Sequence, residues 1–322
     1  MRQFAKPTIV VSKCLEFDAC RYNGEMIPDV TIRNLQPFVT FIPVCPEVEI
    51  GLGTPRETIR IVEENGENRL VQPSTREDVT EKMEQFSNDF LQTIPDVDGF
   101  ILKNRSPSCG TRDVKIYSGF EKAPAKGKGS GLFGGAVIKK FSHLPIEEEG
   151  RLSNFIIREH FFTRLFTIAY YKMIKHNKNM KDLVSFQSDN KYLFMAYNQV
   201  KQKELGRIIA NHKNEKIEVV FENYEKTLYE LFMRTPRYTS NVNVCEHIFG
   251  YFKTKLKKQE KDHFIELLQK YAEKKIPLSS LLTILKSWAI RFDGKYLLRQ
   301  TYFEPYPEAL VEISDSGKGR DY

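Results

Sequence analysis

Short apolar runs alternate with polar turns over the first third of the chain. Runs at 8–13, 38–44 and 99–103 are rich in β-branched and aromatic residues and are bounded by Gly, Pro and charged residues, which is typical of buried strands. An amphipathic stretch at 74–93 predicts a helix before the third run. Buried strands with a helix between them indicate an α/β domain with a mainly parallel sheet.

Two segments depart from this simple alternation. Apolar positions at 58–63 and 68–72 flank Asn65-Gly66, which predicts a β-hairpin. A Gly/Lys-rich segment at 121–135 lacks the order of a nucleotide-binding P-loop, so a nucleoside triphosphate site is not expected there. We expect a surface loop that leads into a helix, with phosphate contact by its amides and lysines as the alternative reading.

The second half of the chain is dominated by a period of 3.6 residues. A long helix is predicted at 154–175, and the polar tetrapeptide 176–179 that follows it marks a boundary. The further predicted helices are 183–211, 217–234, 238–258, 260–274 and 278–291. The pattern therefore predicts two domains, an α/β domain at 1–176 and an all-helical bundle at 180–322.

Composition agrees with a globular protein of this kind. Of the 322 residues, 41% are apolar and 28% are charged. No apolar run approaches the roughly 20 residues that a membrane span needs, and residues 1–7 lack a secretory apolar region, so we expect a cytoplasmic protein without a membrane partner. Five cysteines, an odd number, make a disulfide framework unexpected and leave metal ligation or catalysis as their uses.

The positive charge is concentrated in the second half. Residues 180–322 hold 24 Lys and Arg against 19 Asp and Glu, whereas the first 179 residues hold 25 against 23. An excess of this size is compatible with a polyanionic partner such as nucleic acid but does not establish one.

Three cysteines occupy similar positions at the ends of predicted strands. Cys14 and Cys45 directly follow the first and second runs, and Cys109 follows the third run after a Ser-Pro-Ser turn. The carboxyl ends of neighbouring parallel strands converge on one crevice, so residues far apart in sequence meet there. Three thiolates in one crevice suggest a metal ion or an iron-sulfur cluster.

The spacing of the cysteines disfavours a zinc ribbon but leaves the number of cluster ligands open. Structural zinc sites usually pair their ligands as C-x2-4-C, and the local pair here is Cys14-x5-Cys20. A 4Fe-4S cluster normally takes four thiolates, so a cluster held by three would expose one iron to a substrate. Cys20 is the candidate for a fourth ligand, which would close the cluster. Cys245 is most simply a buried helix residue.

Polar residues beside the cysteines favour a catalytic site. Glu47 lies two residues after Cys45, and Ser106 and Ser108 lie three and one residues before Cys109. A carboxylate could move protons and orient water, and a hydroxyl could hydrogen-bond a substrate. The alternative readings are a surface carboxylate and two serines that only shape a turn.

Several linked motifs in the first half resemble the thiouracil desulfurase (TudS-like) family, in order and across residues 8 to about 170. The motifs are Ser12–Leu15, Cys20–Gly24, Cys45–Glu47, Gly51–Glu57, Lys103, Ser106–Gly110 and Leu144–Leu152. One departure is visible at 15–17, where family members often read Leu-Leu-Gly and this chain reads Leu-Glu-Phe.

The resemblance implies a cofactor and a set of site residues. It implies an oxygen-sensitive 4Fe-4S cluster on three cysteines, which map to Cys14, Cys45 and Cys109. It also implies a glutamate and a serine in catalysis, which map to Glu47 and Ser106, with Ser108 as a further candidate. The candidate substrate-binding residues within the motifs are Arg21, Tyr22, Arg56 and Lys103.

The second half resembles the YbgA-type helical domain that is often fused to this enzyme. The similarity lies in Leu205–Arg207, His247–Lys253, Ile276–Leu278, Leu282–Lys286 and Tyr302–Pro307. This pairing is similar to the two-domain RudS-type desulfidases that act on 4-thiouridine in transfer RNA. Such proteins often carry histidines in the first helix, where this chain has Gln187, Asn190 and Tyr197. If those positions touch RNA, the affinity of this chain for RNA or its preferred target would differ from theirs.

The expected function is a non-redox desulfuration of thiolated uracil, in which 4-thiouridine in tRNA becomes uridine and hydrosulfide is released. The open iron would act as a Lewis acid on the thiocarbonyl sulfur, and Glu47 would prepare the attacking water. The candidate RNA-binding residues are Lys191, Arg207, Lys253, Lys255, Lys257 and Lys258, with a solvated helix face as the alternative reading. Two other functions stay open: desulfuration of a free thiobase such as 2-thiouracil, and a non-enzymatic iron-sulfur sensor on an RNA-binding module.

Overall fold

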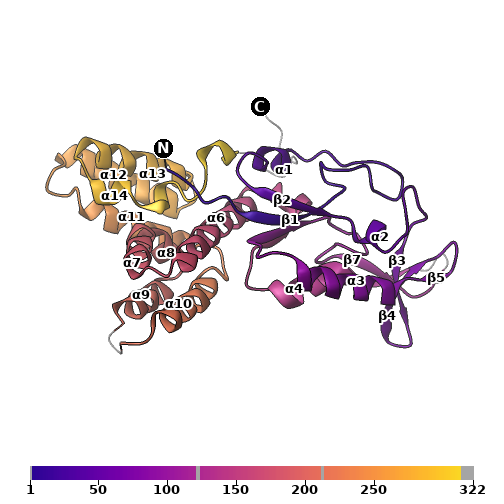
Figure 1. The fold of residues 1–322 in the computed structure, drawn as a ribbon. Coiled ribbons are helices and arrows are strands. Elements are labelled where there is room, and N and C mark those ends of the chain that lie inside the picture. The colour runs from indigo at the N-terminus through magenta and orange to yellow at the C-terminus, as the bar shows by residue number, and fades with distance from the viewer. Residues whose placement is uncertain (1, 121–123, 212–213, 313–322) are drawn as a thin grey trace. The chain divides into compact units, whose positions relative to one another are not determined.

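The protein forms two compact units (Figure 1). The structure is a computed structural model that describes residues 2–120, 124–211 and 214–312. The first unit contains the described residues up to Ala169 and those from Pro307 onward, and the second runs from Tyr170 to Tyr306. The division lies within helix α6 (Phe155–Asn177), a few residues before the polar tetrapeptide at 176–179.

A four-stranded parallel sheet forms the centre of the first unit. Its order is β2 (Thr40–Val44), β1 (Thr8–Ser12), β6 (Gly99–Leu102) and β9 (Ile146–Glu148). Strand β6 is buried along its whole length, as expected of a strand with both faces covered. The predicted α/β fold with a mainly parallel sheet is confirmed.

Helices cover both faces of this sheet (Figure 1). Helix α1 (Val30–Leu35) lies on one side, and α3 (Thr80–Thr93) and α4 (Leu132–Phe141) lie on the other. The rings of Phe90 and Phe133 join α3 to α4, with centroids 5.8 Å apart.

Helix α3 begins later than the sequence pattern predicted. Residues Glu77–Asp78 form the short strand β5, which pairs with a neighbouring strand of a second sheet. Asp78 Oδ1 accepts a hydrogen bond from the N–H of Thr80 at 2.9 Å, so the acidic residue marks the start of the helix. The prediction of a helix from residue 74 was therefore wrong over its first turns.

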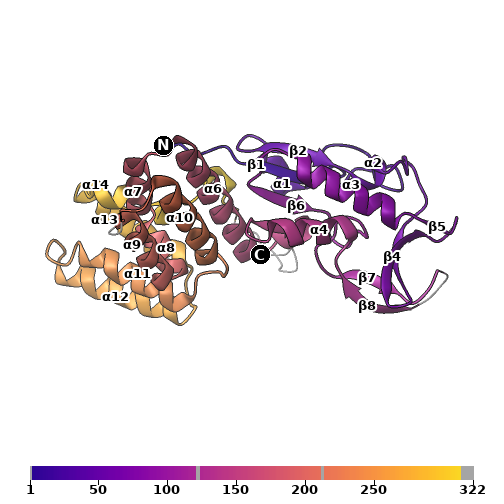
Figure 2. The ribbon, with the colours of Figure 1, turned by 60° about the horizontal axis from the view of Figure 1, so that its bottom comes forward.

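The second sheet of this unit has five strands (Figure 2). Strands β3 (Arg60–Glu64) and β4 (Glu67–Gln72) pair antiparallel around Asn65-Gly66, which confirms the predicted hairpin. Strand β7 (Val114–Tyr117) pairs with β3, and β8 (Ala125–Gly129) pairs with β7 at the edge.

The Gly/Lys-rich segment is therefore not a loop throughout. Residues 125–129 form an edge strand whose Gly129 lies opposite Val114 and whose Gly127 lies opposite Ile116. Lysines at an exposed edge are a common protection against pairing with another chain. Helix α4 follows as expected, and residues 121–123 of the segment lie outside the described residues.

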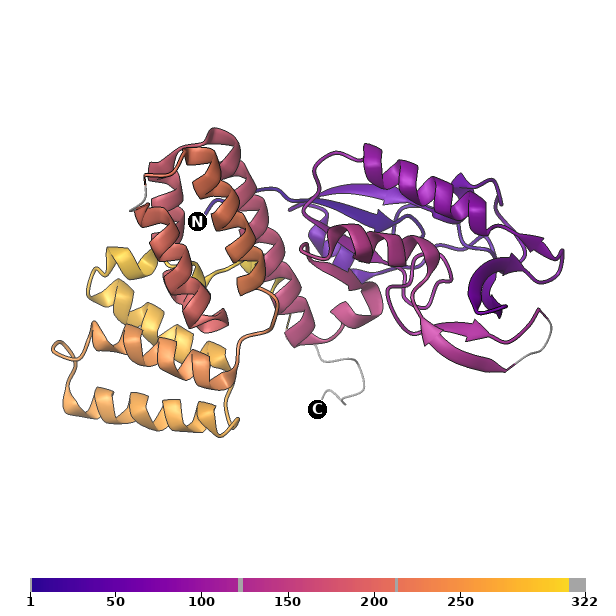
Figure 3. The ribbon, with the colours of Figure 1, turned by 90° about the horizontal axis from the view of Figure 1, so that it is seen from below.

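Helices and turns make up the second unit (Figure 3). After α6 come α7 (Met180–Asp189), α8 (Lys191–Tyr197), α9 (Gln199–Ala210), α10 (Ile217–Leu231), α11 (Tyr238–Gly250), α12 (Lys258–Ala272), α13 (Leu278–Arg291), α14 (Lys295–Leu298) and the 3-10 turn η1 (Thr301–Phe303). Aromatic residues fill the core; Phe186, Tyr224 and Phe264 are almost completely buried. The predicted all-helical second half is confirmed.

Two of the predicted helices differ from the sequence pattern in their length. The helix expected at 183–211 is three helices, because it breaks at Asn190 and Asn198. Asn198 Oδ1 accepts hydrogen bonds from the N–H groups of Val200 and Lys201 at 3.1 Å, as a helix N-cap does. The helix expected at 238–258 ends at Gly250.

The positions at which this chain lacks the histidines of similar proteins are largely internal. Gln187 is 5% exposed and its Oε1 accepts a hydrogen bond from the Tyr224 hydroxyl at 2.6 Å. Asn190 is 1% exposed and donates to the carbonyl of Phe186 at 2.8 Å. These two side chains are hydrogen-bonded within the helical core.

Within the described residues, no helix is both long and apolar enough to cross a bilayer.

A candidate active site at the carboxyl edge of the parallel sheet

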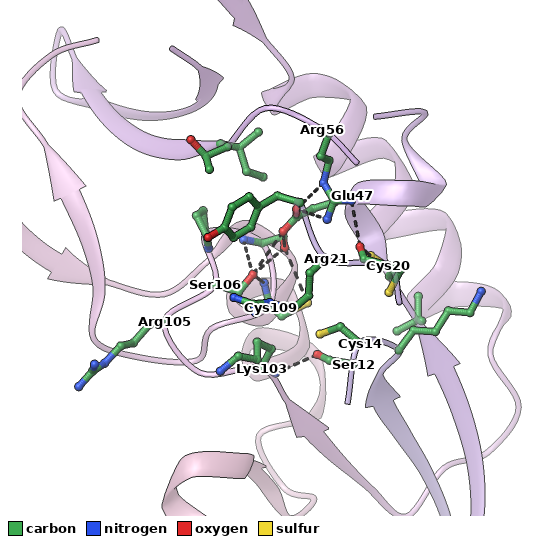
Figure 4. A pocket seen from close by; sticks show the side chains of 18 of the residues that line it. Ser12, Cys14, Cys20, Arg21, Glu47, Arg56, Lys103, Arg105, Ser106 and Cys109 are labelled. Atoms are coloured by element: carbon green, nitrogen blue, oxygen red, sulfur yellow. Dashed lines mark hydrogen bonds and ion pairs between the residues drawn. The ribbon is translucent and has the colours of Figure 1, made fainter. Parts of the chain in front are cut away.

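A cavity of about 350 Å³ lies where β1, β2 and β6 end (Figure 4). This volume is within the range of ligand sites in proteins. The residues that line it are Ser12, Lys13, Cys14, Cys20, Arg21, Tyr22, Val44, Cys45, Glu47, Arg56, Thr58, Ile59, Lys103, Asn104, Arg105, Ser106, Pro107, Ser108 and Cys109. All the predicted ligand, catalytic and substrate-binding residues of the first domain are among them.

The three strand-end cysteines reach this cavity from three adjacent strands. Cys14 lies two residues after β1, and Cys45 directly follows β2 and precedes the short helix α2 (Pro46–Glu49). Cys109 is carried by the loop that follows β6. Cys14 is partly exposed, while Cys45 and Cys109 are 8% and 5% exposed. The convergence expected from a parallel sheet therefore occurs.

Within the described ranges, no group of three or more His, Cys, Asp or Glu side chains is placed to hold one metal ion. A zinc site gathers all its ligands around one ion, whereas each thiolate of a 4Fe-4S cluster binds a different iron.

The three thiols differ in their pKa values because their surroundings differ. Burial raises the pKa of the Cys14 thiol to about 12 and also raises the pKa of Cys109. A hydrogen bond from the Cys20 thiol lowers the pKa of Cys45 to about 7. Coordinated thiols are deprotonated by the positive charge of the metal, so iron would overcome the cost of burying these thiolates.

Cys20 is part of the same pocket wall. Its side chain is 3% exposed, and the hydrogen bond to Cys45 raises the pKa of the Cys20 thiol. The Cys45 thiol also lies 3.8 Å from the Cys20 carbonyl oxygen, to which it donates. Cys20 thus contacts Cys45, a predicted ligand, through hydrogen bonds.

Glu47 is held in the cavity by hydroxyl groups on one side and a guanidinium on the other (Figure 4). Its Oε1 accepts hydrogen bonds from Ser108 Oγ at 2.6 Å and from Ser106 Oγ at 3.4 Å. Its Oε2 accepts from Nε and Nη2 of Arg56 at 2.9 and 2.6 Å. Four donors to one carboxylate fix its direction, as a group that positions water requires.

The two serines have different environments. Ser108 is completely buried, and its hydroxyl spans Glu47 and the Cys109 sulfur, which lies 3.7 Å away. Ser106 is half-buried, and its oxygen accepts the N–H of Cys109 at 3.1 Å and lies 2.9 Å from Ser108 Oγ. Ser106 is therefore the hydroxyl that a ligand in the cavity can reach, while Ser108 braces Glu47.

Arg56 was predicted to bind substrate, but its guanidinium is engaged within the protein. Besides the pair with Glu47, its Nη1 donates to the carbonyl oxygens of Cys20 and Gly53 at 2.9 and 2.8 Å. Its side chain is 4% exposed. Arg56 joins the loop of Cys20 to the loop after Cys45 and helps to position Glu47, while its role in substrate binding stays a prediction.

The other predicted substrate residues, Arg21, Tyr22 and Lys103, also line the cavity. Lys103 Nζ contacts Glu149 Oε1 and Asn104 Oδ1, and the Lys103 N–H donates to Ser12 Oγ at 2.9 Å. Arg21 lies 5.4 Å above the ring of Tyr22, which is 42% exposed. A partly exposed aromatic ring is a suitable surface for a planar base.

Sequence reasoning missed the residues that support these groups. Glu149 accepts the N–H of Asn104 at 2.7 Å, and Glu148 accepts the N–H and hydroxyl of Thr111 at 2.7 and 2.9 Å. Both carboxylates are buried, although a run of three glutamates usually marks a solvated surface. The signal that could have found them is their place at the end of a predicted motif directly after the apolar Leu144–Ile146.

Glycines at the start of α4 allow this helix to support the Cys109 loop. The N–H of Gly134 donates to the Ser108 carbonyl at 2.9 Å, and the N–H of Gly131 donates to the Gly110 carbonyl at 2.8 Å. A Cβ on Gly134 would lie 2.3 Å from the Gly110 carbonyl oxygen and 2.4 Å from that of Cys109. Gly131 and Gly134 therefore serve close backbone packing between α4 and the Cys109 loop.

We predict that Gly134→Ala destabilises the protein by about 1–3 kcal/mol, because the added methyl group must push the Cys109 loop from α4. Thermal unfolding of the full chain should show a lower Tm, by about 2–4 °C per kcal/mol. Gly127→Ala is the matched control, since no atom lies within 4 Å of its added Cβ. Equal Tm values for the two variants would refute the packing role of Gly134.

Comparisons with known proteins cover both halves of the chain. The model of the 2-thiouracil desulfurase family matches residues 9–149, and a family described only as a protein of unknown function (DUF1722) matches residues 191–307. An uncharacterized protein of Bacillus subtilis, YbbK, is 34% identical over 147 residues, which is 44% of this chain and 95% of that protein.

Two further relatives were found. The uncharacterized protein YbgA of Escherichia coli is 23% identical over 156 residues, which is 48% of this chain and 92% of that protein. Among solved structures, a [4Fe-4S]-dependent thiouracil desulfidase, TudS, is similar with 26% identity and a TM-score of 0.35, covering 46% of this chain and 93% of that one. Given the family match and the YbbK relative, this chain belongs to the 2-thiouracil desulfurase family, with a YbgA-type domain following in the same chain.

Proposed function

We propose that this protein is an iron-sulfur-dependent desulfurase that removes sulfur from a thiolated uracil without a change in redox state. The observation that carries the proposal is the convergence of Cys14, Cys45 and Cys109 on a cavity that also holds Glu47 and Ser106. The similarity to a [4Fe-4S]-dependent desulfidase supports the same cofactor here. Cys14, Cys45 and Cys109 would hold the cluster.

A bound cluster with one iron free of protein ligands would supply a Lewis acid for the thiocarbonyl sulfur. Side chains of the cavity would supply the other groups that the reaction needs. Glu47 lines the cavity, where its carboxylate can accept a proton from a water that attacks the ring carbon. The two serine hydroxyls hold its Oε1 in place. Arg56 keeps this carboxylate in place, and Ser106 can donate a hydrogen bond to the ring. The products are uracil, or a uridine, and hydrosulfide.

We further propose 4-thiouridine in tRNA as the substrate, with the second unit as the RNA anchor. Lys253, Lys255, Lys257 and Lys258 are exposed on and around the turn between α11 and α12. Within the described residues none of the four forms an ion pair, whereas Lys201 on α9 is neutralised by Glu204 and Glu230. Lys253 and Lys255 lie over the rings of Phe249 and Phe292, at 5.7 and 5.4 Å from the ring centroids. Lysines without a carboxylate partner on one turn are suited to phosphate contacts. Lys191 and Arg207 are weaker candidates on α8 and α9.

The experiment that tests the function uses the full chain reconstituted with iron and sulfide under anaerobic conditions. It is incubated with thiolated tRNA and, separately, with free 2-thiouracil, and the nucleosides and bases are measured by mass spectrometry. Conversion of 4-thiouridine to uridine with release of hydrosulfide would support the full proposal. Conversion of free 2-thiouracil alone would make the protein a thiobase desulfurase. Absence of hydrosulfide with a full cluster would favour a sensor.

The anchor role of the second unit has its own prediction. Replacing Lys257 and Lys258 by Gln should weaken tRNA binding and reduce the slope of log affinity against log salt by about two, because each phosphate contact contributes about one. Binding is measured by fluorescence anisotropy of labelled tRNA between low and moderate salt. The control is Lys216→Gln with Lys226→Gln, which removes the same charge from exposed positions near and on α10. Identical slopes for the two double variants would contradict the anchor role.

A further inference from the structure

Strand β1 ends in a buried serine that lines the cavity. Ser12 is 1% exposed, and the three residues before it, Ile9–Val11, are apolar and completely buried. A hydroxyl is retained in such surroundings where it has hydrogen-bond partners, because a buried polar group without them costs free energy. The partners of Ser12 therefore indicate what this hydroxyl does.

Both partners of Ser12 belong to the segment that follows β6 (Figure 4). Its oxygen accepts the N–H of Lys103 at 2.9 Å. Burial raises the pKa of the Cys109 thiol, and a hydrogen bond from the Ser12 side chain opposes that rise. Strands β1 and β6 pair in parallel with Val11 opposite Ile101, which brings the end of β1 beside the start of this segment. The sheet thus carries the Ser12 hydroxyl to the sulfur of a predicted cluster ligand.

The proton of Ser12 is available to Cys109, whereas the proton of Ser108 is not. A serine hydroxyl carries a single proton. Ser108 Oγ lies 3.7 Å from the Cys109 sulfur but donates to Glu47 Oε1 at 2.6 Å. At Ser12 the N–H of Lys103 uses the oxygen as an acceptor, so the hydroxyl proton is left for the sulfur. Ser12 is therefore the hydroxyl that donates to this thiol.

A hydrogen bond to a thiolate that holds an iron-sulfur cluster changes the electronic state of the cluster. The donor withdraws electron density from the sulfur, and hydrogen bonds to the sulfurs are among the factors that set the reduction potential. Cys45 has a comparable donor in the Cys20 thiol. Cys20 could itself bind iron, whereas Ser12 carries no thiol, so a change at Ser12 tests the hydrogen bond alone.

We propose that Ser12 is a positioning residue that acts through Cys109, and that its hydrogen bond to this thiolate keeps the iron-sulfur cluster electron-poor. The inference rests on the proposed function, because it places the cluster on Cys109. A thiolate that gives less charge to iron leaves the metal a stronger Lewis acid toward a thiocarbonyl sulfur. The Ser12 hydroxyl would in this way serve the reaction without touching the substrate.

The test measures the reduction potential of the reconstituted full chain in the absence of substrate. Ser12→Ala removes the donor, so we expect a more negative potential and higher iron–thiolate stretching frequencies in the resonance Raman spectrum. At matched iron content kcat should fall by about tenfold, as it does when an outer partner of a metal ligand is lost. Ser12→Thr keeps a hydroxyl on a residue suited to a strand and should restore the potential. An unchanged potential in Ser12→Ala would overturn the proposal.

Ser87→Ala is the matched control. Ser87 is 2% exposed in the same unit, and its hydroxyl donates to the carbonyl of Met83 at 2.6 Å within α3. The variant removes the same oxygen from a buried serine that does not line the cavity, so the potential should stay at the wild-type value. Equal shifts in Ser87→Ala and Ser12→Ala would refute the role of the Cys109 hydrogen bond.

A second pair of variants decides the matter if Ser12→Ala does not retain the cluster. Ser12→Thr and Ser12→Val have nearly the same shape, but only Thr has a hydroxyl. Retention of iron by Ser12→Thr alone, at equal Tm of the two apoproteins, would support the proposal, and loss of iron from both would overturn it. A wild-type chain that takes up no cluster would overturn the proposed function together with this inference. A cluster whose potential depends on Ser12 but which releases no hydrosulfide would overturn the proposed function alone.

Discussion

Replacing Glu47 by Gln should lower kcat by about 10²–10⁴-fold, the usual contribution of a positioned general base. The amide keeps the shape of the side chain and can still accept a hydrogen bond from Arg56, so the pocket should stay intact. It cannot take a proton from water. Turnover of thiouracil is measured under anaerobic conditions at matched iron and sulfide content, so that loss of cofactor is not mistaken for loss of chemistry.

Glu49 provides the matched control for this variant. It lies on the same short helix α2 but is exposed, so Glu49→Gln makes the same change of charge two residues away. We expect its kcat to stay within about twofold of wild type, because exposed substitutions away from a site have small effects. A Glu47→Gln enzyme with a full cluster and undiminished kcat would remove Glu47 from the proposed chemistry.

Substitution of any one predicted cluster ligand should remove the cofactor as well as the activity. Cys14→Ser, Cys45→Ser and Cys109→Ser should each lose most of the bound iron and sulfide after reconstitution, with the visible absorption of the cluster. Changes to residues that only support a metal ligand already cost about 10–100-fold in affinity or activity, so turnover should fall by more than about 100-fold when the ligand itself is changed. Iron and sulfide analysis and absorption spectroscopy measure this without reference to turnover.

Two other cysteines serve as comparisons for the ligand variants. Cys245→Ala changes a buried thiol of the second unit, 3.9 Å from the Tyr302 hydroxyl, and should leave the iron content unchanged. Cys20→Ser tests the number of ligands. With three thiolates on the cluster it should retain the iron, whereas a loss equal to that of Cys14→Ser would identify Cys20 as a fourth ligand and close the proposed substrate position.

Much of the architecture could be predicted because its determinants are local. The runs that became β1 and β6 are buried on both faces, so they read as continuous apolar segments. The run that became β2 forms the edge of the sheet and is only partly buried. Asn65-Gly66 marked the hairpin of the second sheet. The positions of Cys14, Cys45 and Cys109 at one edge followed from the strand ends alone, since parallel strands present their carboxyl ends together.

Other features depended on contacts that the sequence pattern does not display. Strand β8 consists of Ala, Lys and Gly, which have low strand propensity, and it forms because β7 offers a partner. The long helix expected at 183–211 is interrupted because Asn198 caps a new helix. The engagement of Arg56 by Glu47 joins residues nine positions apart through a folded loop, so a role in positioning and a role in substrate binding look alike in sequence.

Because the three thiols come from separate strands, the cluster site depends on the folded sheet. Cys14, Cys45 and Cys109 are separated by 31 and 64 residues, and they meet only once β1, β2 and β6 have paired in parallel. A zinc finger, by contrast, gathers its ligands from one short segment and folds around the metal. Here the sheet must form first, so iron and sulfide would be delivered to an already folded apoprotein whose cavity stands ready to receive them.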